Sequence, residues 1–144
     1  MPGDNIYKAD ATLVQGLQFV GRGAQSGIAV VLDGVEKHGG LESGIRPMEC
    51  LLVSLASCTA MDVISILRKK RQEVTGFRVE VKGVRAEEHP RRYERITLHY
   101  VVQGHDVSEE AVARSIELSQ TKYCGVTASL KSEIDYEYTV EAGN

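Results

Sequence analysis

Apolar and polar residues alternate along several stretches of the chain, and this period of two predicts β-strands. Three such strands are expected in the second half of the chain, at residues 77–85, 93–102 and 133–140. His89-Pro90 marks a turn between the first two, which therefore form a predicted antiparallel hairpin. Residues 9–33 are predicted as two further strands, separated by glycine-containing turn signals at residues 21–27. A glycine-rich loop is expected at 34–44.

The helices are predicted from longer stretches that lack glycine and proline. Pro47 is well placed at the first position of a helix that runs from Met48 to about Arg71, where four basic residues complement the helix dipole. Ser108 is the expected N-cap of a second helix that ends near Lys122, and a short third helix is predicted at 126–130. Residues 1–144 are thus expected to form a single α+β domain.

The long central helix is predicted to be covered on both sides. Placing its residues at steps of 100° gathers large apolar side chains on one face, namely Leu52, Leu55, Ala56, Val63, Ile66 and Leu67. The opposite stripe holds small or weakly polar side chains, namely Cys50, Ser54, Ser57, Cys58, Met61, Asp62 and Ser65. This stripe lacks the Lys/Glu mixture of a solvated face. We therefore expect a second element to cover it, which a small chain achieves most simply as a homodimer.

Composition narrows the function classes. The chain has 144 residues and a formal net charge of -3, and it has no long basic block, so nucleic-acid binding is not expected. No uninterrupted apolar run of about 18 residues is present, and the N-terminus lacks a signal-peptide pattern, so we expect a cytoplasmic protein without a membrane span. The four histidines are scattered without ligand spacing, so a zinc site is not expected.

The three cysteines remain as candidate reactive groups. Free cysteine is often a buried packing residue, so both an inert and a reactive interpretation of Cys58 stay open. Cys50 lies eight residues before it, roughly 12 Å along a helix, which is too far for a disulfide. If Cys58 has a resolving partner, that partner is Cys124, which lies where one predicted helix ends and another begins. Whether the two meet depends on the fold.

Glu49 is a further candidate. It precedes Cys58 by nine residues and lies on nearly the opposite azimuth, so the two side chains cannot touch along one unbroken helix. A role at Cys58 would require a kinked helix or a second subunit. The alternative is an acidic residue that stabilises the first helical turn.

Two motifs resemble those of the OsmC/Ohr family. The stretch RPMECLLVSLASCTAMDV, residues 46–63, is similar to the central-helix motif of that family, and SQTKYCGV, residues 119–126, is similar to its second-cysteine motif. The stretch MDVISILRKKRQ, residues 61–72, is closest to the YhfA-like branch. The resemblance covers about residues 8–140. It favours the reactive interpretation of Cys58 and Cys124.

The resemblance implies antiparallel sheets around a long central helix in an intertwined homodimer. It also implies a thiol-dependent reduction of organic hydroperoxides without a metal or a bound cofactor. Cys58 would attack the peroxide and become a sulfenic acid, Cys124 would resolve it to a disulfide, and an external dithiol such as a lipoyl group would reduce the enzyme. Glu49 matches an acidic residue that the family contributes across the dimer, paired with an arginine.

The arginine that would activate the thiol is not fixed by the sequence. Peroxidase branches place it in the first β-turn region, where Arg22 lies, but the motif around Arg22 does not clearly match. Arg46 is a second candidate, and a site without an equivalent is the third interpretation. Two other functions therefore stay open beside the peroxidase: a redox sensor that forms the same disulfide slowly, and a dimer that binds a small ligand.

Overall fold

The computed structural model describes residues 5–144, and the chain divides into two compact units, Met1–Leu51 and Leu52–Asn144. We describe each unit by itself. Strands and helices are both present, so the predicted α+β class is confirmed. The helix α1 (Pro47–Lys69) begins in the first unit and continues through the second, and its bounds agree with those predicted from Pro47 and the basic cluster.

The first unit contains an antiparallel sheet of three strands, in the order β1 (Ala9–Gln15), β2 (Gln18–Gly23) and β3 (Ala29–Leu32). The prediction of two strands for this region is wrong. A tight turn divides the first predicted strand because Gly16 adopts a left-handed conformation with φ of 54°. Since the turn between the two strands has only two residues, apolar residues continue on both sides of it and conceal it.

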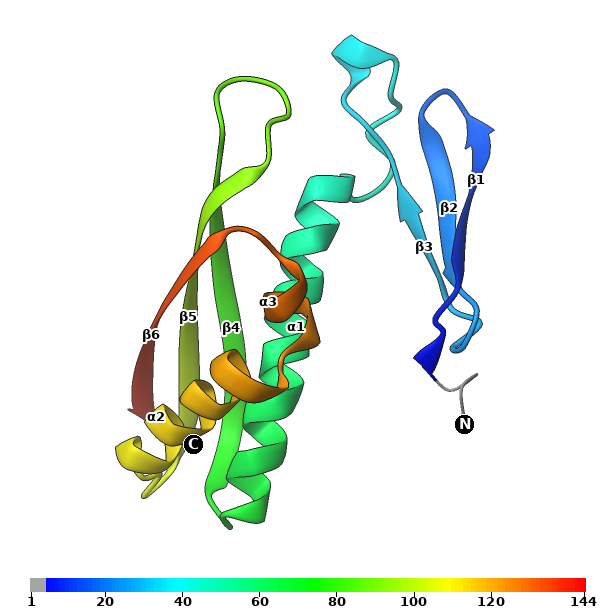
Figure 1. Cartoon of the computed structure of the whole chain (residues 1–144). Helices are drawn as coiled ribbons and strands as arrows, with labels where there is room; N and C mark the ends of the chain where they lie inside the picture. The colour runs from blue at the N-terminus through cyan, green and yellow to red at the C-terminus, as the bar shows by residue number, and fades with distance from the viewer. Residues whose placement is uncertain (1–4) are drawn as a thin grey trace. The chain divides into compact units, whose positions relative to one another are not determined.

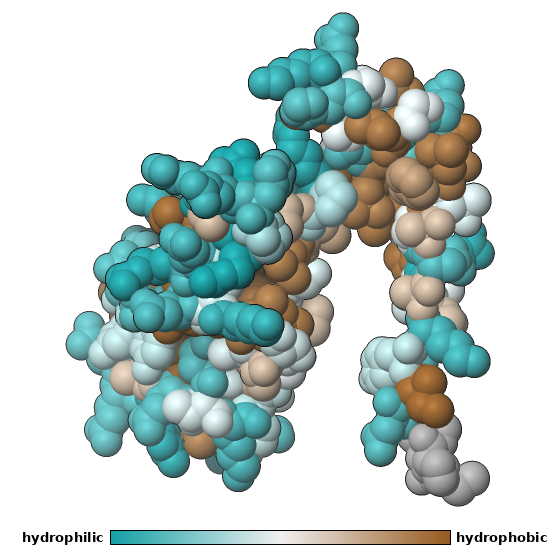
Figure 2. All heavy atoms as spheres, turned by 45° about the horizontal axis from the view of Figure 1, so that its top comes forward, coloured by the Kyte–Doolittle hydropathy of each residue, from teal (hydrophilic) through white to brown (hydrophobic). Residues whose placement is uncertain are grey.

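Apolar side chains of this sheet are left exposed in the single chain. Figure 2 shows hydrophobic side chains gathered on the first unit. They include Leu13, Val14, Phe19, Ile28, Val30 and Val31, which are between 36% and 70% exposed. Contiguous apolar surface of this kind is typical of an interface.

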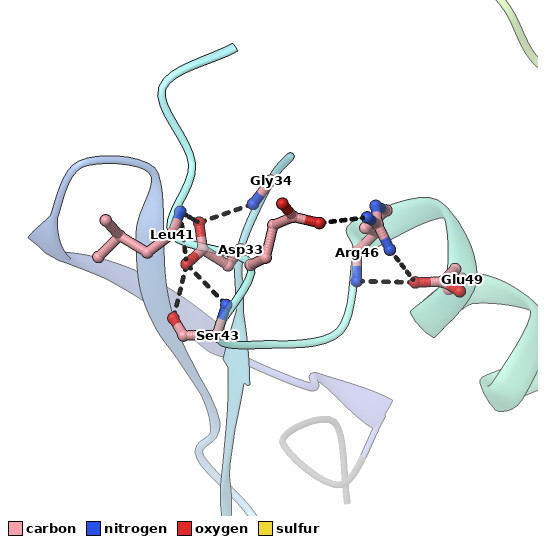
Figure 3. A network of polar contacts seen from close by, with 7 residues as sticks. Asp33, Gly34, Leu41, Ser43, Arg46 and Glu49 are labelled. Atoms are coloured by element: carbon pink, nitrogen blue, oxygen red, sulfur yellow. Dashed lines mark hydrogen bonds and ion pairs between the residues drawn. The ribbon is translucent and has the colours of Figure 1, made fainter. Parts of the chain in front are cut away.

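The loop between β3 and α1 is organised by one carboxylate. Asp33 is 2% exposed, and its carboxylate accepts hydrogen bonds from the backbone N–H groups of Gly34 (2.7 Å), Leu41 (3.2 Å) and Ser43 (3.2 Å), as Figure 3 shows. The Ser43 hydroxyl donates a further bond of 2.6 Å and is the main reason that the pKa of Asp33 falls to about 2. The expected loop at 34–44 is confirmed, although it includes a short helical turn at Glu36–His38.

The second unit contains a mixed sheet in which β5 (Tyr93–His105) lies between β4 (Glu73–Arg85) and β6 (Glu133–Ala142). The predicted antiparallel hairpin of β4 and β5 is confirmed. The expectation of purely antiparallel sheets is wrong, because β6 runs parallel to β5. A parallel pair requires a long crossover, and the helical segment between β5 and β6 provides it.

The helices of the second unit pack on one face of this sheet. The buried residues of α1 are Leu55, Thr59, Val63 and Leu67, spaced by four. The segment after α2 (Glu109–Leu118) lies with α1 on the same side of the sheet (Figure 1). It contacts this face because the Tyr100 hydroxyl on β5 bonds both Thr59 and Gln120. The predicted cap of α2 is confirmed, since the Ala111 N–H donates to the Ser108 hydroxyl at 3.1 Å.

The length and hydropathy of α1 bear on the expectation that the chain has no membrane span. The helix has 23 residues, and its mean hydropathy reaches 2.0 over an 18-residue window, which is enough for a membrane span by length and composition. The few polar residues in this stretch, mostly serine and threonine, interrupt the apolar run without lowering its mean much. Core helices of soluble proteins meet the same criterion, and 28% of this window is buried in the single chain.

Candidate functional site

The fold brings Cys58 and Cys124 together within the second unit. Cys58 lies on α1, and Cys124 lies between a π-helical turn (Ser119–Tyr123) and the short helix α3 (Gly125–Ser129). Both are unbridged thiols, and Cys124 lies close enough to Cys58 to act on its pKa. The expectation that Cys124 sits at the junction of two helices is confirmed, and the pair that the resemblance implied is adjacent in space.

The surroundings of Cys58 favour the neutral thiol. Burial raises the pKa of Cys58, and the backbone N–H of Val126 opposes this by donating a hydrogen bond to the sulfur. The neighbouring Cys124 side chain and the negative charge of Asp62 raise the pKa of Cys58 further. The net direction is upward. Within the described residues, the groups that act most strongly on this pKa do not include a guanidinium.

Cys124 is held by backbone groups on both sides. Its N–H donates to the Ser119 carbonyl oxygen at 2.7 Å, which closes the π-helical turn. Its sulfur is the N-cap of α3 and accepts a hydrogen bond of 3.4 Å from the Thr127 N–H. The side chain is 4% exposed. Since π-helical turns occur frequently at functional sites, this irregularity supports a role for the segment.

A chain of buried hydroxyl groups runs beside the two cysteines. Thr59, which follows Cys58 in sequence, is bonded to Tyr100 and to Ser119, each at 2.7 Å. Ser119 donates to the Asp62 carboxylate at 2.8 Å. A carboxylate only accepts, so each proton is assigned: Tyr100 donates to Thr59, Thr59 to Ser119, and Ser119 to Asp62. Burial, partly offset by the bonds with Thr59 and Gln120, raises the pKa of Tyr100 to about 12, which keeps it a donor at neutral pH.

Gln120 joins this chain to the segment that carries Cys124. Its amide nitrogen donates to the Tyr100 hydroxyl (3.0 Å) and to the Thr59 hydroxyl (3.1 Å), and its amide oxygen accepts from the Thr127 hydroxyl (3.1 Å). The sequence did not reveal Gln120, Thr59 or Tyr100 as site residues. The available signal was that Gln120 lies inside the second-cysteine motif and Thr59 lies beside Cys58.

A hollow of about 460 Å³ lies next to this network, between α1 and the π-helical turn. Its lining includes Met61, Asp62 and Ile66 of α1, together with Leu118 and Tyr123. Asp62 therefore belongs both to this hollow and to the surroundings of Cys58. The hollow offers mainly apolar contacts for a small organic molecule.

Glu49 and Arg46 contact each other in the first unit. The Glu49 carboxylate accepts from the backbone N–H of Arg46 (3.3 Å), as the third helical residue does in a capping box. It also pairs with the Arg46 guanidinium at 3.4 Å, and Glu42 pairs with Arg46 at 3.5 Å (Figure 3). These observations agree with the helix-stabilising alternative for Glu49. They leave its role across a dimer as a prediction.

Arg22 lies on β2, where it lines a shallow hollow of the first unit with residues of all three strands. The choice between Arg22, Arg46 and no arginine as the group that activates Cys58 stays a prediction. In residues 5–144, no group of three or more His, Cys, Asp or Glu side chains is arranged to hold a metal ion.

Comparison with known proteins identifies the family. The sequence model of the family described as "OsmC-like protein" matches residues 39–139. The chain is 39% identical to Protein YhfA of Escherichia coli K12, over 89% of this chain and 92% of that protein. It also resembles a hypothetical protein from Aquifex aeolicus VF5, with a TM-score of 0.85, 33% identity, and 97% and 99% of the two chains covered.

More distant structures share the fold alone. An organic hydroperoxide resistance protein from Elizabethkingia anophelis superimposes with a TM-score of 0.67 at 16% identity, over 96% of both chains. The family match, the similarity to Protein YhfA and the adjacent cysteine motifs agree with one another. This chain belongs to the OsmC-like protein family.

Proposed function

We propose that the protein is a thiol-dependent hydroperoxide reductase that uses Cys58 and Cys124. The observation that carries the proposal is that these two side chains, which are far apart in sequence, lie close enough to interact. Membership of the OsmC-like family supports it, as does the fold shared with proteins described as organic hydroperoxide resistance proteins.

The proposed cycle has three balanced steps. The Cys58 thiolate attacks the distal oxygen of the hydroperoxide, so that an S–O bond forms, the O–O bond breaks, and the alcohol leaves after it takes up a proton. The Cys124 sulfur then attacks the Cys58 sulfenic acid, and water leaves as the disulfide forms. An external dithiol, such as a lipoyl group, exchanges with this disulfide and becomes oxidised. No bound cofactor takes part.

The first step needs a group that lowers the pKa of Cys58. The Val126 N–H contributes in this direction but does not outweigh burial and the nearby negative charges. Arg22 and Arg46 are the proposed candidates for the missing cation, with Glu49 orienting the arginine in a homodimer. The exposed apolar side chains of β1, β2 and β3 support a second copy of the chain as the partner that covers them.

The raised pKa of Cys58 favours one alternative function, a cytoplasmic redox sensor or carrier that forms the same disulfide slowly. Less thiolate at neutral pH means slower attack on a peroxide, while the partner thiol remains in place. The two functions share the cysteine pair and differ in the rate of its first reaction.

A stopped-flow measurement separates the candidates. Consumption of cumene hydroperoxide is followed for the wild type, for Cys58→Ser, and for Cys50→Ser as the matched control. Rapid consumption that is lost only in Cys58→Ser supports the reductase. Slow oxidation that still gives the Cys58–Cys124 disulfide supports the sensor. No loss of thiols would contradict both and leave ligand binding as the function.

A further inference from the structure

We infer that Gln120 is a positioning residue, which fixes Cys124 against Cys58 through Thr59 on one side and Thr127 on the other. The inference rests on the proposed function and assigns a structural cause to its second step, the closure of the disulfide. It concerns residues that do not touch the peroxide.

The carboxamide of Gln120 is a bridge between two segments that are distant in sequence. Its nitrogen donates to the hydroxyl of Thr59, the residue directly after Cys58 on α1. Its oxygen accepts from the Thr127 hydroxyl, and the N–H of the same Thr127 donates to the Cys124 sulfur. One side chain therefore links the helix of the first cysteine to the residue that holds the second.

All hydrogen-bonding groups of this amide are used. The nitrogen has two protons and donates to Thr59 and Tyr100, and the oxygen accepts from Thr127. Thr59 and Tyr100 are fully buried, so one end of the bridge is anchored in the core. Thr127 is only half-buried, and its segment follows a π-helical turn, so the other end of the bridge holds a more exposed part of the chain.

Loss of the Gln120 bridge should leave the stability of the core largely unchanged. Without Gln120, Tyr100 still donates to Thr59, and Thr59 still donates to Ser119. The Thr127 hydroxyl would be reached by water. Loss of the carboxamide therefore leaves the buried hydroxyl groups paired, while it frees the segment that carries Cys124.

Closure of the disulfide should depend on the Gln120 bridge, whereas attack on the peroxide should not. Attack on the peroxide uses the Cys58 sulfur and the group that activates it, and it does not use the Cys124 sulfur. Closure requires the Cys124 sulfur to lie in line with the S–O bond of the sulfenic acid, and the rate of such an intramolecular reaction depends steeply on alignment. Loosening the bridge slows closure and lengthens the lifetime of the sulfenic acid.

The test uses two variants and their matched controls. Gln120→Met keeps the length of the side chain without its hydrogen bonds, and Gln103→Met makes the same change on β5, where Gln103 bonds the exposed Glu141. Thr127→Val removes the hydroxyl that meets Gln120, and Thr127→Ser keeps it. Urea unfolding of each variant checks that the fold is intact, and the Thr127 pair carries the test if Gln120→Met does not fold.

Two rates are measured for each protein. Dimedone trapping reports the formation of the Cys58 sulfenic acid, and quenched-flow mass spectrometry reports the Cys58–Cys124 disulfide. We expect the first rate to change by less than about twofold in every variant, because attack on the peroxide does not use the bridge. Closure should slow at least about tenfold in Gln120→Met and Thr127→Val, with the two control variants near the wild type.

Diamide provides a second route to the same disulfide. It oxidises the two thiols to the disulfide and is itself reduced to the hydrazine, so no peroxide is needed. If the wild type does not react with peroxides, the proposed function is wrong, and closure with diamide still tests Gln120. If Gln120→Met and Thr127→Val close the disulfide as fast as the wild type, the positioning role of Gln120 is wrong.

Discussion

The two units of the chain differ in how completely their apolar side chains are covered. In the second unit, α1 and the segment around α2 bury one face of the sheet, and residues such as Leu98 and Ile116 are fully buried. In the first unit, every residue of β1 is exposed, and apolar side chains stand on the surface. A three-stranded sheet needs a covered apolar face to be stable. The second unit therefore has a closed core beside the two cysteines Cys58 and Cys124, whereas the apolar side chains of the first unit remain uncovered.

Truncation of one leucine in each unit should give the largest contrast. Leu98→Ala leaves a cavity in a closed core and should lower the free energy of unfolding by about 2–5 kcal/mol. Leu13→Ala, at a side chain that is 57% exposed, should change it by about 0.5 kcal/mol or less in dilute protein. Urea unfolding at a low and a high protein concentration measures both.

The dependence of unfolding on protein concentration tests whether a second copy of the chain covers the first unit. If a second copy covers β1, the wild type gains stability as its concentration rises, and Leu13→Ala reduces that gain. Equal losses for Leu13→Ala at both concentrations would contradict coverage by a second copy.

The buried hydroxyl chain gives the next largest effect. Thr59→Val preserves the shape of the side chain but removes the bonds to Tyr100 and Ser119, and it should cost about 1–3 kcal/mol of unfolding free energy. Thr59→Ser keeps the hydroxyl and serves as the control. Denaturant unfolding that shows Thr59→Val as stable as Thr59→Ser would contradict the importance of this network.

The lowered pKa of Asp33 leads us to expect that the stability of the first unit depends on pH. The pKa of Asp33 is lowered from 3.8 to about 2, mainly by the Ser43 hydroxyl. Its contribution to stability is therefore complete above pH 3.8 and is lost as the pH falls through about 2. The protection factors for hydrogen exchange at the Leu41 and Ser43 amides, followed between pH 5 and pH 2, should fall over this range. Asp33→Asn should remove the dependence, whereas protection that is unchanged at pH 2 would contradict it.

The smallest expected effect concerns the electrostatics of Cys58. Asp62 helps to raise the pKa of Cys58, so Asp62→Asn should lower this pKa and increase the fraction of thiolate at pH 7. The rate of alkylation by iodoacetamide, measured against pH in a Cys50→Ser, Cys124→Ser background, reports the change. Asp135→Asn, on an exposed position of β6, is the control. An alkylation profile that does not move in Asp62→Asn would exclude Asp62 as a source of the raised pKa.

Helices whose first residue has a clear sequence signal could be predicted from the sequence. The turn at Gly16 and the direction of β6, which leave no such signal, could not. Pro47 and the absence of glycine located α1, and Ser108 located α2. The turn at Gly16 was missed because alternation continued across it, and the direction of β6 was missed because a strand's pattern of side chains is the same in both directions.

The site was predictable only in part for a similar reason. The spacing along α1 excluded Cys50 as a partner of Cys58, and the family motif indicated Cys124. Contacts such as those of Thr59 with Tyr100 and Gln120 join residues 41 and 61 positions apart, so they arise only when the chain is folded. The position of Thr59 between Leu55 and Val63, at a spacing of four, was the available sign that it faces the core.

The distance in sequence between the two cysteines has a consequence for the unfolded chain. A bond between Cys58 and Cys124 would close a loop of about 66 residues, and restricting the unfolded chain to this extent is worth about 4 kcal/mol in the chain-entropy treatment. The loop would enclose β4, β5 and α2 and would tie α1 to the segment before β6. Oxidation would then oppose unfolding of the second unit, and heat resistance would follow the redox state of the cell.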